Sequence, residues 1–263
     1  SALYGSDALG GVINIITRKG KGGLKSSVKA GVGNQTTFRE EFRNERGWEK
    51  FNYSFSASRT DSSGQYSRDT YKRTSLAGQV EFKLANGMSL NYKGLFNEAS
   101  KEIGLSLFAV SSSLLQTFFD ENWLNKKRLL INSLTLKHHP KEWWDYTLQG
   151  SYVNDRLILD DEASPDQNFD LFYTLKTNRK SAGTQHNFYP YKSDVISLGV
   201  EYKEDDVDRV RESPSNQIIK RSKKDWGFYI QNIFSHEDTF SLTTGLRADI
   251  YDSFGNTYNP KIS

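Results

Sequence analysis

Two short acidic clusters are the residues whose type and spacing could hold a metal ion. One is Glu-Asp-Asp-Val-Asp at 204–208, and the other is Asp-Asp-Glu at 160–162. Carboxylate oxygens are preferred ligands of calcium, and several of them in one loop can share an ion. The first cluster therefore predicts a calcium site formed by Asp205, Asp206 and Asp208 in a loop. A solvated acidic surface without a bound ion explains the same residues, and the sequence leaves both interpretations open.

Basic residues in the polar stretches could attract an anionic ligand, because positive charges around a cleft raise the local concentration of anions. The candidates are Arg68, Arg73, Arg209 and Arg211. An apolar segment at 103–110 could contact the same ligand through Phe108. Ordinary solubility explains any single one of these cations, and packing of the loop on itself explains the apolar segment.

The remaining reactive side chains form no recognisable catalytic set. The sequence contains no cysteine, which excludes disulfides and thiol chemistry. No nucleophile, base and acid lie at a known spacing, and no phosphate-binding loop is present. The formal net charge of +3 is too small for the basic footprint of nucleic-acid binding. We therefore predict a protein that is not an enzyme, has no cofactor and binds no nucleic acid.

Alternation of apolar and polar residues dominates the chain after residue 23. In 51–58 and 226–234, for example, apolar side chains occupy nearly every second position. A period of two places the apolar residues on one face of a β-strand and the polar residues on the other. Phe82 and Leu242 are assigned to the apolar face, and Ser89 to the polar face. We count about eleven such strands and the start of one more, each near ten residues long.

The connections between these strands alternate in length. Short turns such as Ala-Asn-Gly at 85–87 contain strong hairpin signals. The polar loops at 61–72, 100–126, 156–168 and 206–222 are longer. Short turns on one side and long loops on the other are typical of barrels in an outer membrane. A soluble β-sandwich has no reason to place its long loops on one side.

The bulk composition is compatible with a membrane barrel. Mean hydropathy is −0.68 and aromatic residues make up 13%. Because outward apolar residues alternate with inward polar ones in a barrel, the average hydropathy stays low. Aromatic residues near strand ends favour a girdle at the membrane interface. The girdle candidates are Tyr53, Tyr92, Trp143, Trp144, Tyr146, Tyr202, Trp226, Tyr229 and Tyr251.

The stretch at 1–18 combines a small-residue turn, a glycine pair and a β-branched run that predicts a short buried strand. The glycine pair allows the backbone to turn and to lie close to another backbone. This stretch resembles the end of the plug domain in TonB-dependent outer-membrane receptors, where a YGSxAxGGVINIIT pattern leads into the barrel. The motif residues expected to support the plug fold are Tyr4, Gly5, Gly10, Gly11, Val12 and Asn14.

The resemblance implies three parts. Residues 1–18 would be the C-terminal end of a plug domain, 19–23 a flexible linker, and 24–263 the N-terminal part of a transmembrane β-barrel. Plugged receptors of this family have about 22 strands, so the chain would hold about 11 to 12 of them and would be an internal piece of a longer polypeptide. The expected fold class is therefore all-β, a partial antiparallel transmembrane barrel preceded by the last strand of a plug.

The function implied by the resemblance is energised uptake of a scarce ligand across the cell outer membrane. An iron–siderophore complex or cobalamin is the implied ligand, with haem and oligosaccharides left open. The implied partners are TonB, acting through a TonB box expected before Ser1, and the surrounding outer-membrane lipid and lipopolysaccharide. Divalent ions on the acidic clusters could bridge to the lipopolysaccharide, and contact with it is an alternative explanation of the basic loop residues. The alternatives are a passive porin-like outer-membrane barrel and a soluble β-rich adhesion or carbohydrate-binding module. The plug motif argues against the porin, and the loop lengths argue against the soluble module.

Overall fold

The computed structural model describes residues 19–65, 69–103, 106–107, 117–118, 123–161, 171–211, 216–236, 239–253 and 255–263. The strands in these ranges are β1 (Lys25–Gly33), β2 (Thr37–Gly47), β3 (Phe51–Ser62), β4 (Tyr71–Lys83), β5 (Ser89–Ile103), β6 (Ser106–Leu107), β7 (Thr117–Phe118), β8 (Trp123–Lys141), β9 (Trp144–Asp161), β10 (Leu171–Tyr191), β11 (Asp194–Arg211), β12 (Gln217–His236), β13 (Phe240–Tyr251) and β14 (Gly255–Ile262). Among these residues no helix is long and apolar enough to cross a membrane.

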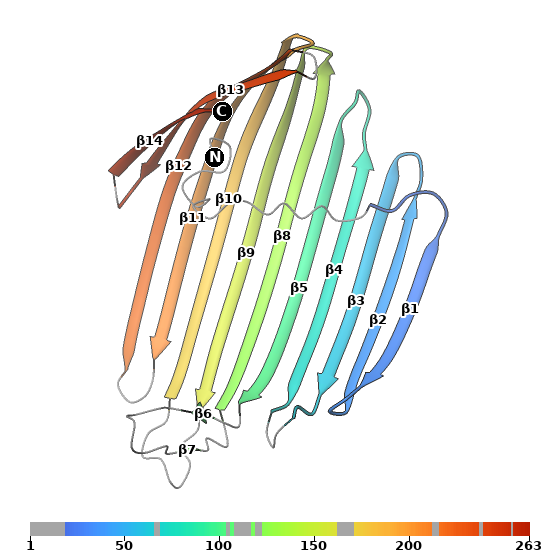
Figure 1. Cartoon of the computed structure of the whole chain (residues 1–263), viewed down its shortest axis with the longest axis vertical. Helices are drawn as coiled ribbons and strands as arrows, with labels where there is room; N and C mark the ends of the chain where they lie inside the picture. The colour runs from blue at the N-terminus through green and yellow to red at the C-terminus, as the bar shows by residue number, and fades with distance from the viewer. Residues whose placement is uncertain are drawn as a thin grey trace.

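Twelve of the strands form one antiparallel sheet in which β5 is followed directly by β8, while β6 and β7 pair separately. Each strand of the large sheet is hydrogen-bonded to its neighbours along the chain, which gives a simple up-and-down meander (Figure 1). The twelve strands confirm the expectation of eleven strands and the start of another. The short turns gather at the upper end of the sheet in Figure 1, and β6 and β7 lie at its lower end.

The turn chemistry explains several of the tight connections. Asn86 and Gly87 have φ angles of 59° and 72° between β4 and β5, as a two-residue hairpin turn with two left-handed positions requires. At the opposite end, Gln35 and Thr36 have φ angles of 60° and 49° between β1 and β2. This first connection on the long-loop side is therefore a short turn, as the sequence indicates near Asn34.

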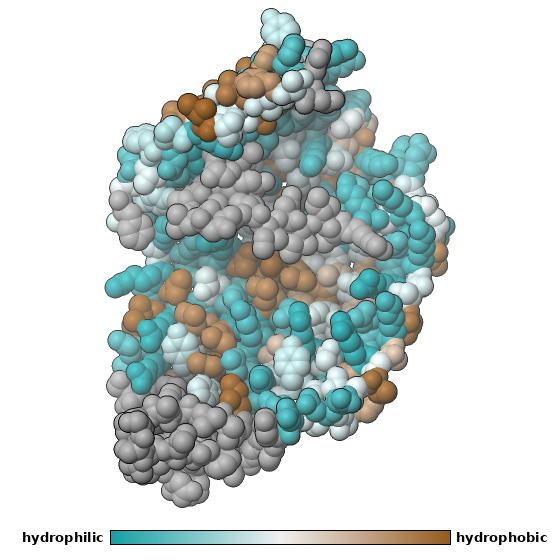
Figure 2. Space-filling model, in the orientation of Figure 1, coloured by the Kyte–Doolittle hydropathy of each residue, from teal (hydrophilic) through white to brown (hydrophobic). Residues whose placement is uncertain are grey.

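The two faces of the sheet differ in chemistry. Large apolar side chains such as Phe82, Leu134 and Leu242 are exposed on the outer face. The buried polar side chains lie on the inner face and are Asn52, Gln79, Glu81, Ser197, Asp225, Gln231, Arg247 and Asp249. In the view of Figure 2, hydrophilic residues cover much of the surface, with a group of hydrophobic residues near the middle. Apolar outside and polar inside is the reverse of a water-soluble protein and is what a barrel wall in lipid requires.

The strands of the second half are longer than the sequence predicts. β8, β10 and β12 contain 19, 21 and 20 residues, about twice the length needed to cross the hydrocarbon. The additional residues of β8 and β12 include 123–126 and 217–222, which the sequence assigns to the loops 100–126 and 206–222. Charged residues on the long strands pair across the sheet, for example Lys180 Nζ with Glu204 Oε1 at 4.0 Å. The polar stretches are therefore partly solvated strand that continues the ladder beyond the apolar band.

Candidate functional site

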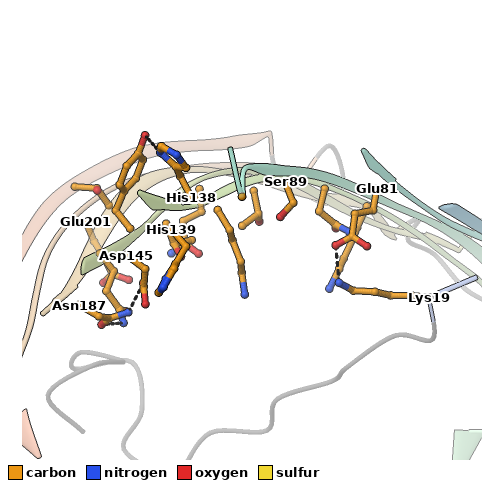
Figure 3. Close-up of a pocket in the computed structure, with 18 of the residues that line it drawn as sticks. Lys19, Glu81, Ser89, His138, His139, Asp145, Asn187 and Glu201 are labelled. Atoms are coloured by element: carbon orange, nitrogen blue, oxygen red, sulfur yellow. Dashed lines mark hydrogen bonds and ion pairs between the residues drawn. The ribbon is translucent and has the colours of Figure 1, made fainter. Parts of the chain in front are cut away.

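A hollow of about 840 Å³ lies under the inner face in the half of the sheet that carries the short turns. Figure 3 shows Glu81, Ser89, Asp145 and Glu201 pointing into it from β4, β5, β9 and β11. The inward position of Ser89 and the outward positions of Phe82 and Leu242 confirm the faces assigned from the alternation. The hollow is large enough for a small-molecule ligand or for a protein segment.

A hydrogen-bond network fixes the side chains on one flank of the hollow. Asp145 accepts from Asn187 Nδ2 at 2.8 Å and from the Tyr189 hydroxyl at 2.5 Å. Gln185 Nε2 donates to Asn187 Oδ1 at 2.9 Å, and the Tyr229 hydroxyl donates to Gln185 Oε1 at 2.9 Å. The network therefore links β9, β10 and β12, and it holds these polar groups against the wall instead of in the lumen.

Arg247 is the most deeply buried cation of the inner face. Its side chain is 1% exposed, its Nη2 donates to Glu201 Oε2 at 2.9 Å, and its Nε donates to Asp249 Oδ1 at 2.8 Å. A buried charge is costly unless its partners satisfy it, and removal of one partner from such a group is strongly destabilising. The guanidinium also lies 5.8 Å from the centre of the Tyr229 ring. These contacts indicate a structural node that ties β11, β12 and β13 together.

The segment 19–23 packs against the wall, although the sequence predicts a flexible linker there. Lys19 Nζ lies 2.6 Å from Glu81 Oε1, and Asn52 Nδ2 donates to the other oxygen of Glu81 at 2.7 Å. Gly20 is buried, and a Cβ at this position would lie 2.2 Å from the Tyr53 carbonyl oxygen. Only glycine therefore fits this close approach of two backbones. The segment is fastened to β2, β3 and β4 in this state.

The long-loop half of the inner wall carries the cations of the candidate ligand site. Arg209 and Arg211 lie on β11 and share the inner face with Glu201. The Arg209 guanidinium lies 5.2 Å from the centre of the Tyr173 ring, a cation–π contact. Its Nε is buried and makes no hydrogen bond within the described residues. The neighbouring inward cations on β10 to β12 are Arg179, Lys203, Arg221 and Lys223.

The other sequence candidates lie elsewhere. Arg73 is on β4 rather than in a loop, where its Nε donates to Asn97 Oδ1 at 2.7 Å. Four strands separate β4 from β11, so Arg73 does not belong to the Arg209 cluster. Arg68, Phe108 and the motif residues at 1–18 lie outside the described residues.

The calcium hypothesis placed Asp205, Asp206 and Asp208 in a loop, and this placement is wrong. All three lie on β11, where Asp205 faces inward and the other two face outward. Asp205 Oδ1 lies 2.5 Å from Arg179 Nε, so an arginine already neutralises it. Across the described ranges, no group of three or more histidine, aspartate or glutamate side chains could hold a metal ion. Successive side chains of a regular strand point to opposite faces of the sheet. The three carboxylates therefore cannot surround one calcium ion as several oxygens of a single loop can.

Outward aromatic residues gather near the short-turn end. Two of the girdle candidates, Tyr202 and Trp226, contact each other farther along β11 and β12, and two others face inward. Trp144 stacks on Phe188 and His186 at ring-centre distances of 6.4 and 6.0 Å on the outer face. Tyr229, by contrast, is only 8% exposed and belongs to the inner network. Tyr251 also faces inward, with Lys223 Nζ 4.7 Å from its ring centre. For these two residues the interfacial interpretation is wrong, because each lies one position out of phase with the apolar face.

The sequence analysis predicts no functional role for the charged residues at or beside the hollow. Lys19 belongs to the predicted linker, and Glu81, Asp145, Glu201 and Arg247 stand at ordinary polar positions of alternating strands. The alternation could have shown that these residues face inward, because each barrel residue of this set occupies a polar position of its strand. Their mutual contacts depend on the strand register, which the pattern alone does not specify.

Comparison with known proteins finds similarity both in sequence and in structure. No protein-family model matches the chain. The whole chain is 23% identical to the "Iron-regulated outer membrane virulence protein" of Vibrio cholerae serotype O1 and covers 39% of it. In structure it resembles the ferric enterobactin receptor PfeA of Pseudomonas aeruginosa, with a TM-score of 0.76, 16% identity and coverage of 100% of this chain and 44% of the receptor. The chain has the fold of a TonB-dependent siderophore-receptor barrel.

A second receptor gives the same result. The ferripyoverdine receptor of Pseudomonas aeruginosa matches with a TM-score of 0.73 and 14% identity, over 94% of this chain and 39% of the receptor. The expected all-β partial barrel is thus confirmed, and the expected location in the outer membrane agrees with these matches. The chain spans 39% of the curated relative and 44% of the first solved receptor, which is less than half the length of either protein.

Proposed function

We propose that the chain forms the first half of the barrel of a TonB-dependent receptor that takes up an anionic ferric siderophore. The observation that carries this proposal is the cationic inner wall of β10 to β12 in the long-loop half, centred on Arg209 and Arg211. Cations on the wall of a cleft attract an anionic chelate and raise its rate of capture. The fold supports a role in the outer membrane, and the matched solved receptors are named for ferric enterobactin and ferripyoverdine.

The same wall suits a ligand with both charge and aromatic surface. Arg209 is directly opposite Leu175 on β10, and Leu175 is opposite Leu157 on β9. Tyr173 adds an aromatic face beneath the Arg209 guanidinium. Aliphatic and aromatic side chains beside a few fixed cations are the usual lining of a small-molecule site. We therefore favour a ferric chelate with aromatic iron-binding groups over cobalamin.

The proposal includes a plug and an energy source. A receptor lumen that is closed against leakage must open before a bound ligand passes, and the opening requires work from outside the barrel. Residues 1–18 would end the plug, and TonB would supply the work through a TonB box. The contacts of Lys19 and Gly20 with β2 to β4 support this arrangement, because they hold the segment after the plug against the wall.

The test is radioactive iron uptake by a deletion strain that expresses the intact protein, supplied with ferric catecholates, ferric hydroxamates or cobalamin. We expect uptake of a ferric catecholate that is lost without TonB. Arg209→Gln combined with Arg211→Gln should raise the half-saturating ligand concentration about tenfold, as expected when two charge-assisted contacts are removed at a partly solvated site.

The matched control is Arg39→Gln combined with Arg43→Gln. These two arginines also face inward, but both pair with Glu41, at 2.9 and 3.6 Å. The control should leave the half-saturating concentration unchanged. Equal effects of the two double variants would refute a local role of the β11 arginines. Uptake of cobalamin alone, or uptake that persists without TonB, would refute the proposed ligand class or the proposed energy source.

A further inference from the structure

A group of aliphatic side chains interrupts the polar inner face at mid-height. It begins on β5, where Leu95 has the same phase as Ser89 and Lys93, which line the hollow. The group, which we call the inner aliphatic patch, consists of Leu95, Leu129, Ile131, Val153, Leu157 and Leu175, all half-buried. Figure 2 shows hydrophobic residues gathered near the middle of the sheet. Because the lumen side of a membrane barrel is normally polar, an apolar group there indicates a binding surface.

The strand register joins these side chains into one surface. Leu95 is directly opposite Ile131, and Ile131 is directly opposite Val153. Farther along β9, Leu157 is directly opposite Leu175 on β10. Directly opposite residues share a face and lie about 5 Å apart at Cβ. The patch therefore extends across the four neighbouring strands β5, β8, β9 and β10.

Polar side chains border the patch. Toward the short turns, Ser133 is directly opposite Ser151, and Ser151 is directly opposite Ser181. The hydroxyl oxygens of Ser151 and Ser181 are 2.7 Å apart. On β10, Arg179 is directly opposite Val153. The patch is therefore a bounded surface on a polar wall.

One ion pair lies within the patch. Asp155 lies between Val153 and Leu157 on the inner side of β9, and its Oδ2 is 3.4 Å from Lys127 Nζ on β8. The two charges are opposite, and both side chains remain more than a third exposed, so they add little directional binding. Contact with the patch is therefore dominated by its aliphatic side chains, which favour a hydrocarbon because hydrophobic contact is non-directional.

The long-loop end of the patch adjoins the candidate ligand site. Leu175 is directly opposite Arg209, whose guanidinium contacts the ring of Tyr173. A ligand with its anionic part at Arg209 therefore places an apolar extension on the patch. The segment before β1 instead contacts β2 to β4, and none of these strands contributes a side chain to the patch. Continuity with the cations favours the ligand over that segment as the occupant.

The patch has the length of an acyl chain. From Leu95 to Leu175 the register crosses three strand spacings and advances four residues along β9. At about 4.8 Å per spacing and about 3.3 Å per residue, the distance is about 20 Å. One leaflet of a bilayer, which the acyl chains of one lipid fill, is about 15 Å deep, since the whole hydrocarbon core is about 30 Å thick.

We propose that the inner aliphatic patch binds a hydrocarbon chain carried by the ferric chelate, so that the substrate class is an acylated anionic siderophore. This inference rests on the proposed function and makes its ligand class narrower. The cations at Arg209 and Arg211 take the anionic iron-binding head, and the patch removes the chain from water. A chelate that lacks the chain uses the cations alone and is captured more weakly.

The first test compares uptake of two ferric chelates by a deletion strain that expresses the intact protein. The two chelates share one iron-binding head, and only one carries an acyl chain. The half-saturating concentration should be about tenfold lower for the acylated chelate, because several methylene groups leave water. The advantage should grow with chain length and level off once the chain exceeds the patch, at about 20 Å.

Matched double variants locate the effect. Ile131→Thr combined with Val153→Thr keeps the branched shapes and adds two hydroxyls, so the advantage of the acylated chelate should fall to about twofold or less. The control, Val207→Thr combined with Ile219→Thr, changes the same residue types on the inner side of β11 and β12, outside the patch. It should leave the advantage intact. Arg209→Gln combined with Arg211→Gln should weaken uptake of both chelates by the same factor.

The second test needs no substitution and uses an acylated ferric chelate with a photoreactive diazirine at the end of its chain. After illumination of the purified intact protein with this probe, mass spectrometry should find the label on Leu95 or Ile131, the part of the patch farthest from Arg209. Label confined to outward residues such as Leu134, or to a plug, would overturn the proposal.

The uptake results separate this inference from the proposed function. Equal half-saturating concentrations of the two chelates in the unaltered protein would overturn the acyl-chain site, while uptake of both would still support a ferric-siderophore receptor. Equal loss of the advantage in both threonine double variants would also overturn the site. Absence of uptake of either chelate would refute the proposed function, and this inference with it.

Discussion

Gly199 on β11 gives the most direct test of how the inner wall is built. A Cβ at this position would lie 2.1 Å from Tyr229 Cζ and 2.3 Å from the Tyr229 hydroxyl oxygen. The Tyr229 ring therefore occupies the space that any side chain at position 199 would need. Gly199→Ala must displace the ring, and displacement breaks the 2.9 Å hydrogen bond from Tyr229 to Gln185.

The expected cost can be assembled from these contacts. Overpacking of a rigid site costs about 1–3 kcal/mol, and the loss of one hydrogen bond adds about 1 kcal/mol. Replacement of glycine by alanine returns about 0.5 kcal/mol through the unfolded chain. The net loss of folding free energy is therefore about 2.5 kcal/mol, which corresponds to a roughly seventyfold change in the folding equilibrium.

The assay is equilibrium unfolding of the intact protein in detergent, followed by the mobility difference between folded and unfolded barrel on gels. Gly150→Ala is the control, because a Cβ there meets only the Ser181 carbonyl oxygen at 3.8 Å, an ordinary contact. The control should be neutral or slightly stabilised. In a double-mutant cycle, Tyr229→Ala should remove most of the cost of Gly199→Ala. Equal stability of the Gly199 and Gly150 variants would refute the role assigned to the ring.

Two further changes test the faces of the sheet and the segment before β1. Leu242→Asp, at an outward apolar position, should block assembly of the intact protein, whereas Ser89→Asp on the inner face should be tolerated; a charge in the bilayer costs about 2–4 kcal/mol for a basic residue and less for an acidic one. The opposite ranking on a heat-modifiability gel would mean that the faces are inverted. Gly20→Ala should lower stability by about 2 kcal/mol through overpacking against β3, while Gly23→Ala, with nothing within 4 Å of the added Cβ, should have no effect; proteolysis rates before Lys25 would reveal the detached segment.

The strand order and the two faces follow from the sequence because both depend on local pattern. Phe82, Leu242 and Ser89 could be assigned by a period of two alone. Asn86 and Gly87 mark a hairpin because only residues that tolerate positive φ fit such a turn. A meander pairs each strand with its neighbour in sequence, so the topology required no long-range information.

The candidate site could be predicted only in part, because it depends on register. Arg209 and Arg211 stand out as basic residues, but their partner Tyr173 lies about thirty-five residues earlier and meets them only through the β10–β11 pairing. For Asp205, Asp206 and Asp208 the prediction was wrong in another way. Their high charge density is typical of a loop, but they lie on a strand. Cross-strand pairing with residues such as Arg179 makes a charged strand stable, and the charge count of one segment does not reveal its partner.

The ion pairs and hydrogen bonds of the inner wall also indicate how the segment before β1 is joined to the barrel strands. Arg247 pairs with Glu201 and Asp249 within the wall, although the second carboxylate oxygen of Asp249 makes no hydrogen bond within the described residues. Asp145 is held by Asn187 and Tyr189. All of these partners come from barrel strands. Glu81 is the exception, because Lys19 supplies one of its hydrogen bonds from outside the barrel strands. The segment from Lys19 to Gly22 is therefore joined to the wall, and any opening motion of the proposed receptor that detached this segment would have to break the ion pair between Lys19 and Glu81.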